Sequence, residues 1–140
     1  MVDSTHDLAL VTVDNSRSRI PPLQTESAGP RVGEQLALIG IPAVSQFPLS
    51  GFQPNATITP GIVLATDQAQ QLTSAEGVPE TLTDAIRVTT SGTLSGESGG
   101  PAIDAAGKVV GVIEGGGFGV ATLTPVADVR SVLTLSPLRA

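Results

Sequence analysis

One segment of the sequence has the residue types and spacing of a catalytic turn. In Gly96-Glu97-Ser98-Gly99-Gly100-Pro101 a serine stands among glycines. Glycines tolerate positive φ and let backbone approach closely, so they can hold such a serine on a tight turn. Consecutive backbone N–H groups on a turn of this kind can point into one concavity and stabilise an oxyanion. Ser98 is therefore a candidate nucleophile, although a bare GxSxG pattern is also found in solvent-exposed glycine-rich loops.

Two unrelated classes of enzyme place a serine in GxSxG. In α/β-hydrolases the serine lies between a strand and a helix, and the catalytic His follows it in the chain. Here Ser98 is followed by Gly-Gly-Pro and a predicted hairpin, and the single His, at position 6, lies upstream. Both features exclude the α/β-hydrolase arrangement. The chymotrypsin order of His, then Asp, then Ser is the alternative.

The elements that must position this turn are short strands and one helix. Residues 15–30 are predicted to be a connector, residues 67–83 a long polar loop, and Gly115-Gly116-Gly117 a flexible break. Pro60-Gly61 suggests a bulge or an edge within the strand that contains it. Strands are predicted, from apolar and β-branched runs bounded by Gly, Pro or polar residues, at 8–13, 34–41, 57–66, 84–90, 101–104, 108–114 and 119–124.

A helix is predicted at the end of the chain. Thr124 and Pro125 look like an N-cap followed by Pro at the first helical position, with Asp128 in the first turn. Val126, Val129, Val132 and Leu133 recur on one helical face. We therefore expect an all-β fold of about six short strands in a small antiparallel barrel, with a C-terminal helix.

Composition limits the possible functions. The 140 residues suffice for one domain, and 40% hydrophobic with 14% charged residues excludes intrinsic disorder. With no Cys and one His we expect no thiolate or His-rich metal centre, and no metal or cofactor. The net charge of −6 argues against nucleic acid as a partner. No apolar run approaches the ~20 residues of a membrane helix, so no membrane span is expected.

Several segments resemble one family. Residues 95–102 resemble the G-[DN]-S-G-G-P segment around the nucleophile of trypsin-like serine proteases, and His6-Asp7-Leu8-Ala9-Leu10 resembles the segment that carries their catalytic Asp. Both come in the order of that family. Residues 32–42, 58–63, 107–112 and 122–133 are similar to strands and to the closing helix of its HtrA-type branch. The resemblance runs from about residue 6 to about residue 133. It implies that the barrel is a six-stranded antiparallel Greek-key barrel, the second barrel of a chymotrypsin-like fold, with a C-terminal helix.

The resemblance implies roles for individual residues. Ser98 would attack the scissile carbonyl, the backbone N–H groups of Gly96 and Ser98 would form the oxyanion hole, and Asp7 would orient the catalytic imidazole. Gly92 falls at the base of the specificity pocket and carries no charge, which favours a small or medium apolar substrate side chain over Lys or Arg. The residues implied to bind substrate are Gly92, Thr93, Glu114, Gly115 and Gly116.

The sequence departs from the family at three positions. Glu97 replaces the usual Asp or Asn before the nucleophile. Glu114 stands where the family has a small or polar residue; a buried carboxylate there would be costly unless paired, so we expect it to face solvent or to alter the pocket. The third departure is the catalytic His. His6 directly precedes Asp7, and neighbours on a strand point to opposite faces, so His6 is predicted to be an exposed polar residue rather than the base.

The family carries that His in a first barrel upstream of the Asp. Residues 1–30 are therefore predicted to be a remnant strand of the first barrel plus a connector, and residues 31–140 to be the second barrel with its closing helix. The strand at 8–13 would have no partner, and we expect it to fray, to pair with another chain or to lie on the remaining barrel.

The function predicted from these residues is a serine-type endopeptidase that forms an acyl-enzyme on Ser98, present here as a half without its His and inactive alone. Two alternatives stay open: a non-catalytic, peptide-binding pseudoprotease, or a half-enzyme complemented by a His-bearing chain. The expected partners are a peptide or protein substrate and a first barrel, or another chain, paired with residues 8–13. The N-terminus lacks the features of a signal peptide, so either the chain stays in the cytosol or Met1 is not the natural start; the family suggests the periplasm or secretion.

Overall fold

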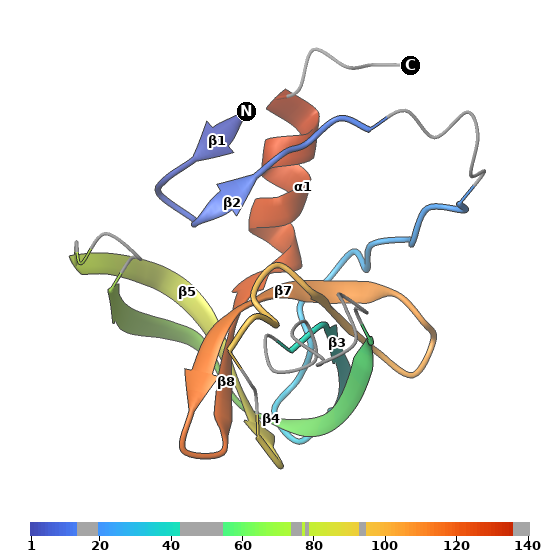
Figure 1. Cartoon of the computed structure of the whole chain (residues 1–140), viewed down its shortest axis with the longest axis vertical. Helices are drawn as coiled ribbons and strands as arrows, with labels where there is room; N and C mark the ends of the chain where they lie inside the picture. Colours follow the sequence, from blue (N-terminus) through green and yellow to red (C-terminus); the bar gives the residue numbers. More distant parts are fainter. Residues whose placement is uncertain (14–19, 43–54, 74–76, 78, 93–94, 136–140) are drawn as a thin grey trace, which may run out of the picture.

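A closed barrel forms the centre of the computed structural model, which describes residues 1–13, 20–42, 55–73, 77, 79–92 and 95–135 (Figure 1). The strands follow one another around the barrel in the order β3-β4-β5-β8-β7-β6, and β6 closes the ring on β3. Because β5 pairs with β8 and not with β6, the chain crosses the barrel end between them, as the predicted Greek-key barrel requires. The strands are β3 (Gln35–Gly40), β4 (Thr57–Thr73), β5 (Pro79–Thr90), β6 (Pro101–Ile103), β7 (Val109–Gly117) and β8 (Val120–Pro125), and every pair is antiparallel.

Alternating side chains fill the barrel. Successive residues of a strand point to opposite faces, so every second residue of β3 is buried. Among the described residues, the core is a cluster of aliphatic side chains: Leu36, Leu38, Val63, Ile86, Val88, Ala102, Val110, Ile113, Ala121 and Leu123.

Pro60-Gly61 does not mark an edge. β4 is paired on both sides, with Pro60 opposite Ala37 of β3 and Gly61 opposite Thr90 of β5. A Cβ on Gly61 would lie 2.5 Å from Val88 Cγ1, so the glycine is required by the close approach of the two strands. The irregularities of the β4–β5 pair come later, between Val63 and Gln70.

The polar loop predicted at 67–83 is wrong. β4 runs on to Thr73 and β5 begins at Pro79, so most of this segment is a hairpin arm that projects from the barrel (Figure 1). Polar contacts cross the arm, such as Gln71 Nε2 donating to Thr81 Oγ1 at 3.2 Å. The segment is mostly polar, and Leu82 is the only buried apolar side chain among its described residues, so the sequence lacks the alternation that marks a half-buried strand. The flexible break predicted at 115–117 is likewise wrong, since β7 ends only at Gly117.

The N-terminal strand is shorter than predicted and has a partner. Of residues 8–13 only β2 (Leu8–Ala9) is a strand, and it pairs with β1 (Val2–Asp3). The Leu10 amide extends this N-terminal hairpin by donating to the Met1 carbonyl at 2.8 Å. The predicted absence of a partner is therefore wrong: part of the edge is covered by the residues immediately upstream.

The helix α1 (Val126–Leu135) rises from the barrel beside the N-terminal hairpin (Figure 1). β8 continues through Pro125, so the helix begins one residue later than predicted, and Thr124 is not its cap. The Thr124 hydroxyl instead donates to the His6 carbonyl at 3.2 Å. Asp128 lies in the first turn as predicted, and Val126 and Val132 are buried against the barrel. Within the described residues, no helix has the length and apolar character needed to cross a membrane.

Candidate active site

The predicted catalytic turn is a tight turn that leads into a strand. Ser98 is exposed and lies between Gly96 and Gly99, whose φ angles are 98° and 88°. Those positive values are the conformation that glycine adopts without strain. The Gly99 amide donates to the Ile113 carbonyl at 2.7 Å, which ties the turn to β7. Because β6 and not a helix follows, the structure agrees with the exclusion of the α/β-hydrolase arrangement.

Glu97 anchors this turn to the end of the β3–β4 pair. Its side chain is 4% exposed, and its Oε1 accepts a hydrogen bond from Thr57 Oγ1 at 2.8 Å. A Cβ on Gly40, the register partner of Thr57, would come within 2.7 Å of the Glu97 side chain. A Cβ on Gly100 would lie 2.0 Å from the Ile39 carbonyl oxygen. Close backbone packing and one buried hydrogen bond therefore fix the turn, and the substitution of Glu for Asp or Asn has a structural partner.

A pocket of 260 Å³ lies beside the turn and joins four of the predicted site residues. Gly96 and Ser98 line it from the turn, and Gly115 and Gly116 line it from β7. The remaining lining residues are Ser95, Glu97 and Ile113. The predicted oxyanion donors and part of the predicted substrate wall thus share one concavity.

Two other predicted substrate residues, Gly92 and Glu114, stand outside that lining. Gly92 follows the end of β5 with φ 142°. Thr93, the third, lies outside the described residues. The Glu114 side chain is half-buried, and its backbone is the part that meets the turn. Its carbonyl accepts a hydrogen bond from Ser98 Oγ at 2.6 Å. A peptide carbonyl is not a base at neutral pH, so this contact holds the hydroxyl proton without activating the oxygen.

Ser98 and Asp7 both line a second cavity, of 420 Å³. Asp7 enters it from the turn between β1 and β2, where its φ of 50° is unusual for a residue other than glycine. The other described lining residues are apolar and come from the hairpin, the serine turn, β7 and α1: Leu8, Ala9, Leu10, Gly99, Val112, Val129, Val132 and Leu133. The predicted nucleophile and the predicted orienting acid therefore face one cavity.

The His6 imidazole is directed away from this cavity. Its Nδ1 lies 2.8 Å from Asp3 Oδ2, and its Nε2 lies 3.7 Å from Asp128 Oδ1. The residue lies in the turn before β2 and is half-buried, so the prediction of an exposed residue is wrong. Sequence reasoning missed its two acidic partners, and it missed Thr57 as the partner of Glu97. Asp128 and Thr57 are distant in sequence from their partners, and no local pattern links them.

Comparison of the sequence with known protein families agrees with the barrel, the glycine-flanked serine and the upstream aspartate. The model of the trypsin-like peptidase domain matches residues 1–112. The chain belongs to the trypsin-like peptidase family. This confirms the resemblance found in the sequence, and it supports a serine protease at the level of the family. No curated protein matches the sequence.

Solved structures share the fold of this trypsin-like peptidase. The active form of the Rv3671c protease from M. tuberculosis superposes with a TM-score of 0.76 at 24% identity, covering 99% of this chain and 57% of that one. The inactive form of the same protease gives 0.61 at 24% identity, with 84% and 55% covered. Deg5 gives 0.68 at 24% identity, with 93% and 55% covered. These neighbours are HtrA/Deg-type serine proteases, and the chain spans little more than half of their length.

Proposed function

We propose that this chain is the serine-bearing half of an HtrA-type endopeptidase that cleaves peptide bonds through an acyl-enzyme on Ser98. The observation that carries the proposal is the 420 Å³ cavity that Asp7 and Ser98 both line. An imidazole entering this cavity would meet the hydroxyl on one side and the carboxylate on the other. Its apolar walls suit a hydrophobic segment, and the proposed occupant is a His-bearing first barrel that belongs to polypeptide outside these 140 residues.

In the assembled site the imidazole takes the proton of Ser98 Oγ, which releases the bond to the Glu114 carbonyl. Oγ then attacks the scissile carbonyl, and the negative charge that develops on its oxygen is stabilised by the N–H groups of Gly96 and Ser98. The imidazolium, held by Asp7, returns the proton to the leaving amine. Water repeats the cycle on the ester and frees Ser98. Losing one oxyanion donor costs roughly 3 kcal/mol of transition-state stabilisation, or about a hundredfold in kcat.

Substrate preference follows from the pocket beside the turn. Glycines at positions 115 and 116 leave room for a side chain, and the neutral Gly92 supplies no counter-ion for Lys or Arg. Glu97 lines the pocket, but its Oε1 is occupied by Thr57. We therefore expect kcat/KM to be highest for small or medium apolar residues at the cleaved position. A panel in which Arg gives the highest kcat/KM would overturn this specificity.

A fluorophosphonate probe, which reacts with activated serines, tests the proposal. We expect slow or no labelling of Ser98 in the chain alone, and rapid labelling after addition of the first barrel encoded in frame upstream of Met1. Ser98→Ala is the matched control for labelling at another site. Rapid labelling of the lone chain would contradict the requirement for an external imidazole. An upstream reading frame without a barrel-sized segment that contains His would remove the proposed partner.

One observation favours a second function, a non-catalytic barrel that binds peptides. The ring nitrogens of His6 face Asp3 and Asp128, and the Ser98 hydroxyl donates to a carbonyl. A chain that keeps this arrangement would retain the pocket without the chemistry. Peptide binding that is unchanged in Ser98→Ala, with no probe labelling in the presence of the upstream barrel, would select this function over proteolysis.

A further inference from the structure

His6 stands at the junction of three elements. It occupies the turn of the N-terminal hairpin, and its Nδ1 contacts Asp3 of the same hairpin at 2.8 Å. Its Nε2 lies 3.7 Å from Asp128 Oδ1 in the first turn of α1. Its carbonyl oxygen accepts the hydroxyl of Thr124, at the end of β8, at 3.2 Å. One residue therefore links the hairpin to the helix and to the barrel.

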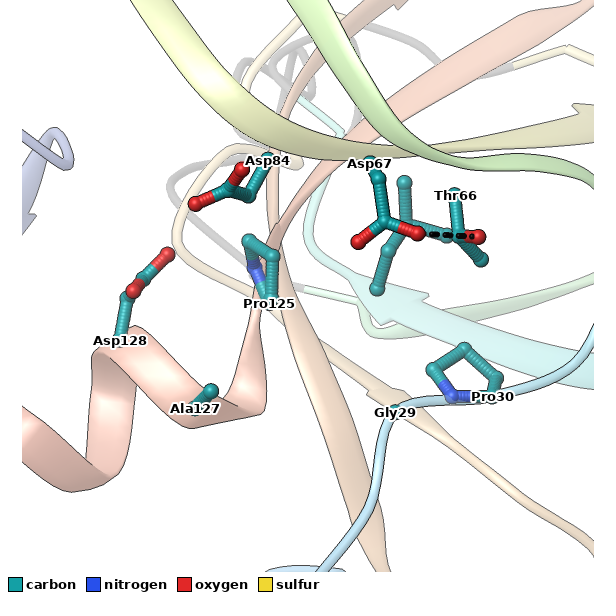
Figure 2. Close-up of a pocket in the computed structure, with 9 residues that line it drawn as sticks. Gly29, Pro30, Thr66, Asp67, Asp84, Pro125, Ala127 and Asp128 are labelled. Carbon is teal, nitrogen blue, oxygen red and sulfur yellow. Dashed lines mark hydrogen bonds between the residues drawn. The ribbon is translucent and has the colours of Figure 1, made fainter.

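The surroundings of the ring are acidic. Asp3 from β1, Asp128 from α1 and Asp84 from β5 all act on His6 electrostatically. Figure 2 shows Asp84 and Asp128 pointing toward one another across a pocket of 390 Å³, with Asp67 farther along its wall. None of the described residues that line this pocket is basic. Among the described residues, the positive charge that acts on Asp128 is that of a protonated His6.

Only the imidazolium suits both neighbours. A neutral imidazole has one N–H and one lone pair. If Nδ1 donates to Asp3, the lone pair of a neutral ring on Nε2 faces the Asp128 carboxylate, which is repulsive. The imidazolium donates to Asp3 and turns its second N–H and its positive charge toward Asp128, with which it forms an ion pair at 3.7 Å. The hydrogen bond to Asp3 is the largest cause that raises the pKa of His6 above its usual 6.5, and the Coulomb attraction of Asp128 adds to it.

We propose that His6 is a positioning residue for Asp7: protonated between Asp3 and Asp128, it latches the N-terminal hairpin onto α1 and so holds Asp7 at the cavity it shares with Ser98. Asp7 is the next residue, so movement of the latch moves it. The docking of the hairpin by His6 does not depend on the proposed function. Its effect on catalysis does rest on that function, because it acts through Asp7.

The sign of the pH dependence follows from the raised pKa. A group whose pKa is higher in the docked state stabilises docking below its ordinary value of about 6.5 and loses that contribution as pH rises through the docked value. Burial raises the pKa of Asp128, because a carboxylate there loses hydration, and His6 opposes this effect. Once His6 is neutral, the charges of Asp3, Asp84 and Asp128 face each other without compensation, and the hairpin releases.

Distance measurement between two spin labels tests the latch in the chain itself. The sequence has no Cys, so Ser4→Cys on the hairpin and Ser131→Cys on α1, both at exposed positions, provide the only label sites. We expect a narrow distance distribution at about pH 5.5 that broadens as pH rises through the His6 pKa, with circular dichroism showing the barrel intact throughout. NMR titration of the single imidazole gives that pKa independently.

Three variants make the test specific. His6→Gln should give the broad distribution at every pH, and Asp128→Asn should move the midpoint to lower pH. Asp67→Asn, which changes a carboxylate of the same pocket that does not act on His6, should leave the midpoint unchanged. Equal distance distributions at low and high pH would overturn the latch, and so would a distribution in His6→Gln that is as narrow as in the parent. Because no proteolysis is measured, that failure would leave the Ser98 labelling experiment unaffected.

Discussion

Replacing Thr57 by Val removes the hydroxyl that anchors the catalytic turn and leaves a side chain of nearly the same shape. The lost bond, from Thr57 Oγ1 to Glu97 Oε1, measures 2.8 Å and ends on a carboxyl that is almost completely buried. Thr57 itself is half-buried, so water can replace part of the bond. The rest of the barrel should be unaffected, because the deleted hydroxyl's other contact, with the Gly40 carbonyl, is long at 3.4 Å.

The magnitude follows from the cost of removing one donor from a buried acceptor. Such a loss costs about 1–3 kcal/mol, and the partial exposure of Thr57 places the expected loss near the middle, about 2 kcal/mol. For a domain of this size that corresponds to a fall in Tm of roughly 8 °C. Thr57→Ser keeps the hydroxyl and should lose less than half as much.

Denaturant unfolding of Thr57→Val, Glu97→Ala and the double variant forms a mutant cycle for this bond, since each single variant removes one of its partners. We expect a coupling free energy of about 1 kcal/mol or more, because the two side chains are in direct contact. In spectra of the native state, the amide resonances of Gly96 and Ser98 should shift in Thr57→Val, since the turn is held through Glu97. If the two single variants change the free energy of unfolding additively, and the two amide resonances do not shift, the bond from Thr57 to Glu97 does not anchor the turn.

Three shorter predictions concern stability. Phe118 has φ 53° in the β7–β8 turn, so Phe118→Asn should raise the free energy of unfolding by about 0.5–1 kcal/mol while Phe118→Ala gives little. Gly61→Ala should lose about 2–3 kcal/mol through its clash with Val88, whereas Gly29→Ala, with nothing within 4 Å, should change stability little. Bonds from the backbone and side chain of Ser27 and from Lys108 lower the pKa of Glu26 to about 2. The parent should therefore have a higher free energy of unfolding than Glu26→Gln above pH 4.5, and the difference should vanish toward pH 2. Acid-unfolding curves of the two proteins would show this.

Local sequence patterns predicted the barrel because most of its strands carry their own signals. β3 alternates buried and exposed residues, β6 and β7 flank a turn at Gly107, and Asp128 marks the first turn of α1. The glycines around Ser98 likewise indicate a tight turn from residue type alone. Each of these features depends on neighbours within a few residues, which is the range over which sequence periodicity operates.

The hairpin arm between β4 and β5 was not predictable in this way. Its residues are mostly polar, and they are paired because the barrel carries two adjacent strands past its rim. The β1–β2 pair is similar, since two residues on each side are too few for a periodic signal. In both cases backbone pairing, which any sequence can supply, is imposed by position in the fold.

The sequence by itself determined the family, the strand and helix content of the barrel, and the serine turn, because those depend on residue type and short spacing. Tertiary structure alone decided which distant groups share a site. It brought Asp7 to the cavity of Ser98, placed Thr57 under Glu97, and turned His6 toward Asp128 instead of the serine. The physical reason is that contacts between side chains far apart in sequence are fixed by strand order, register and helix placement. Local sequence patterns predict none of these three.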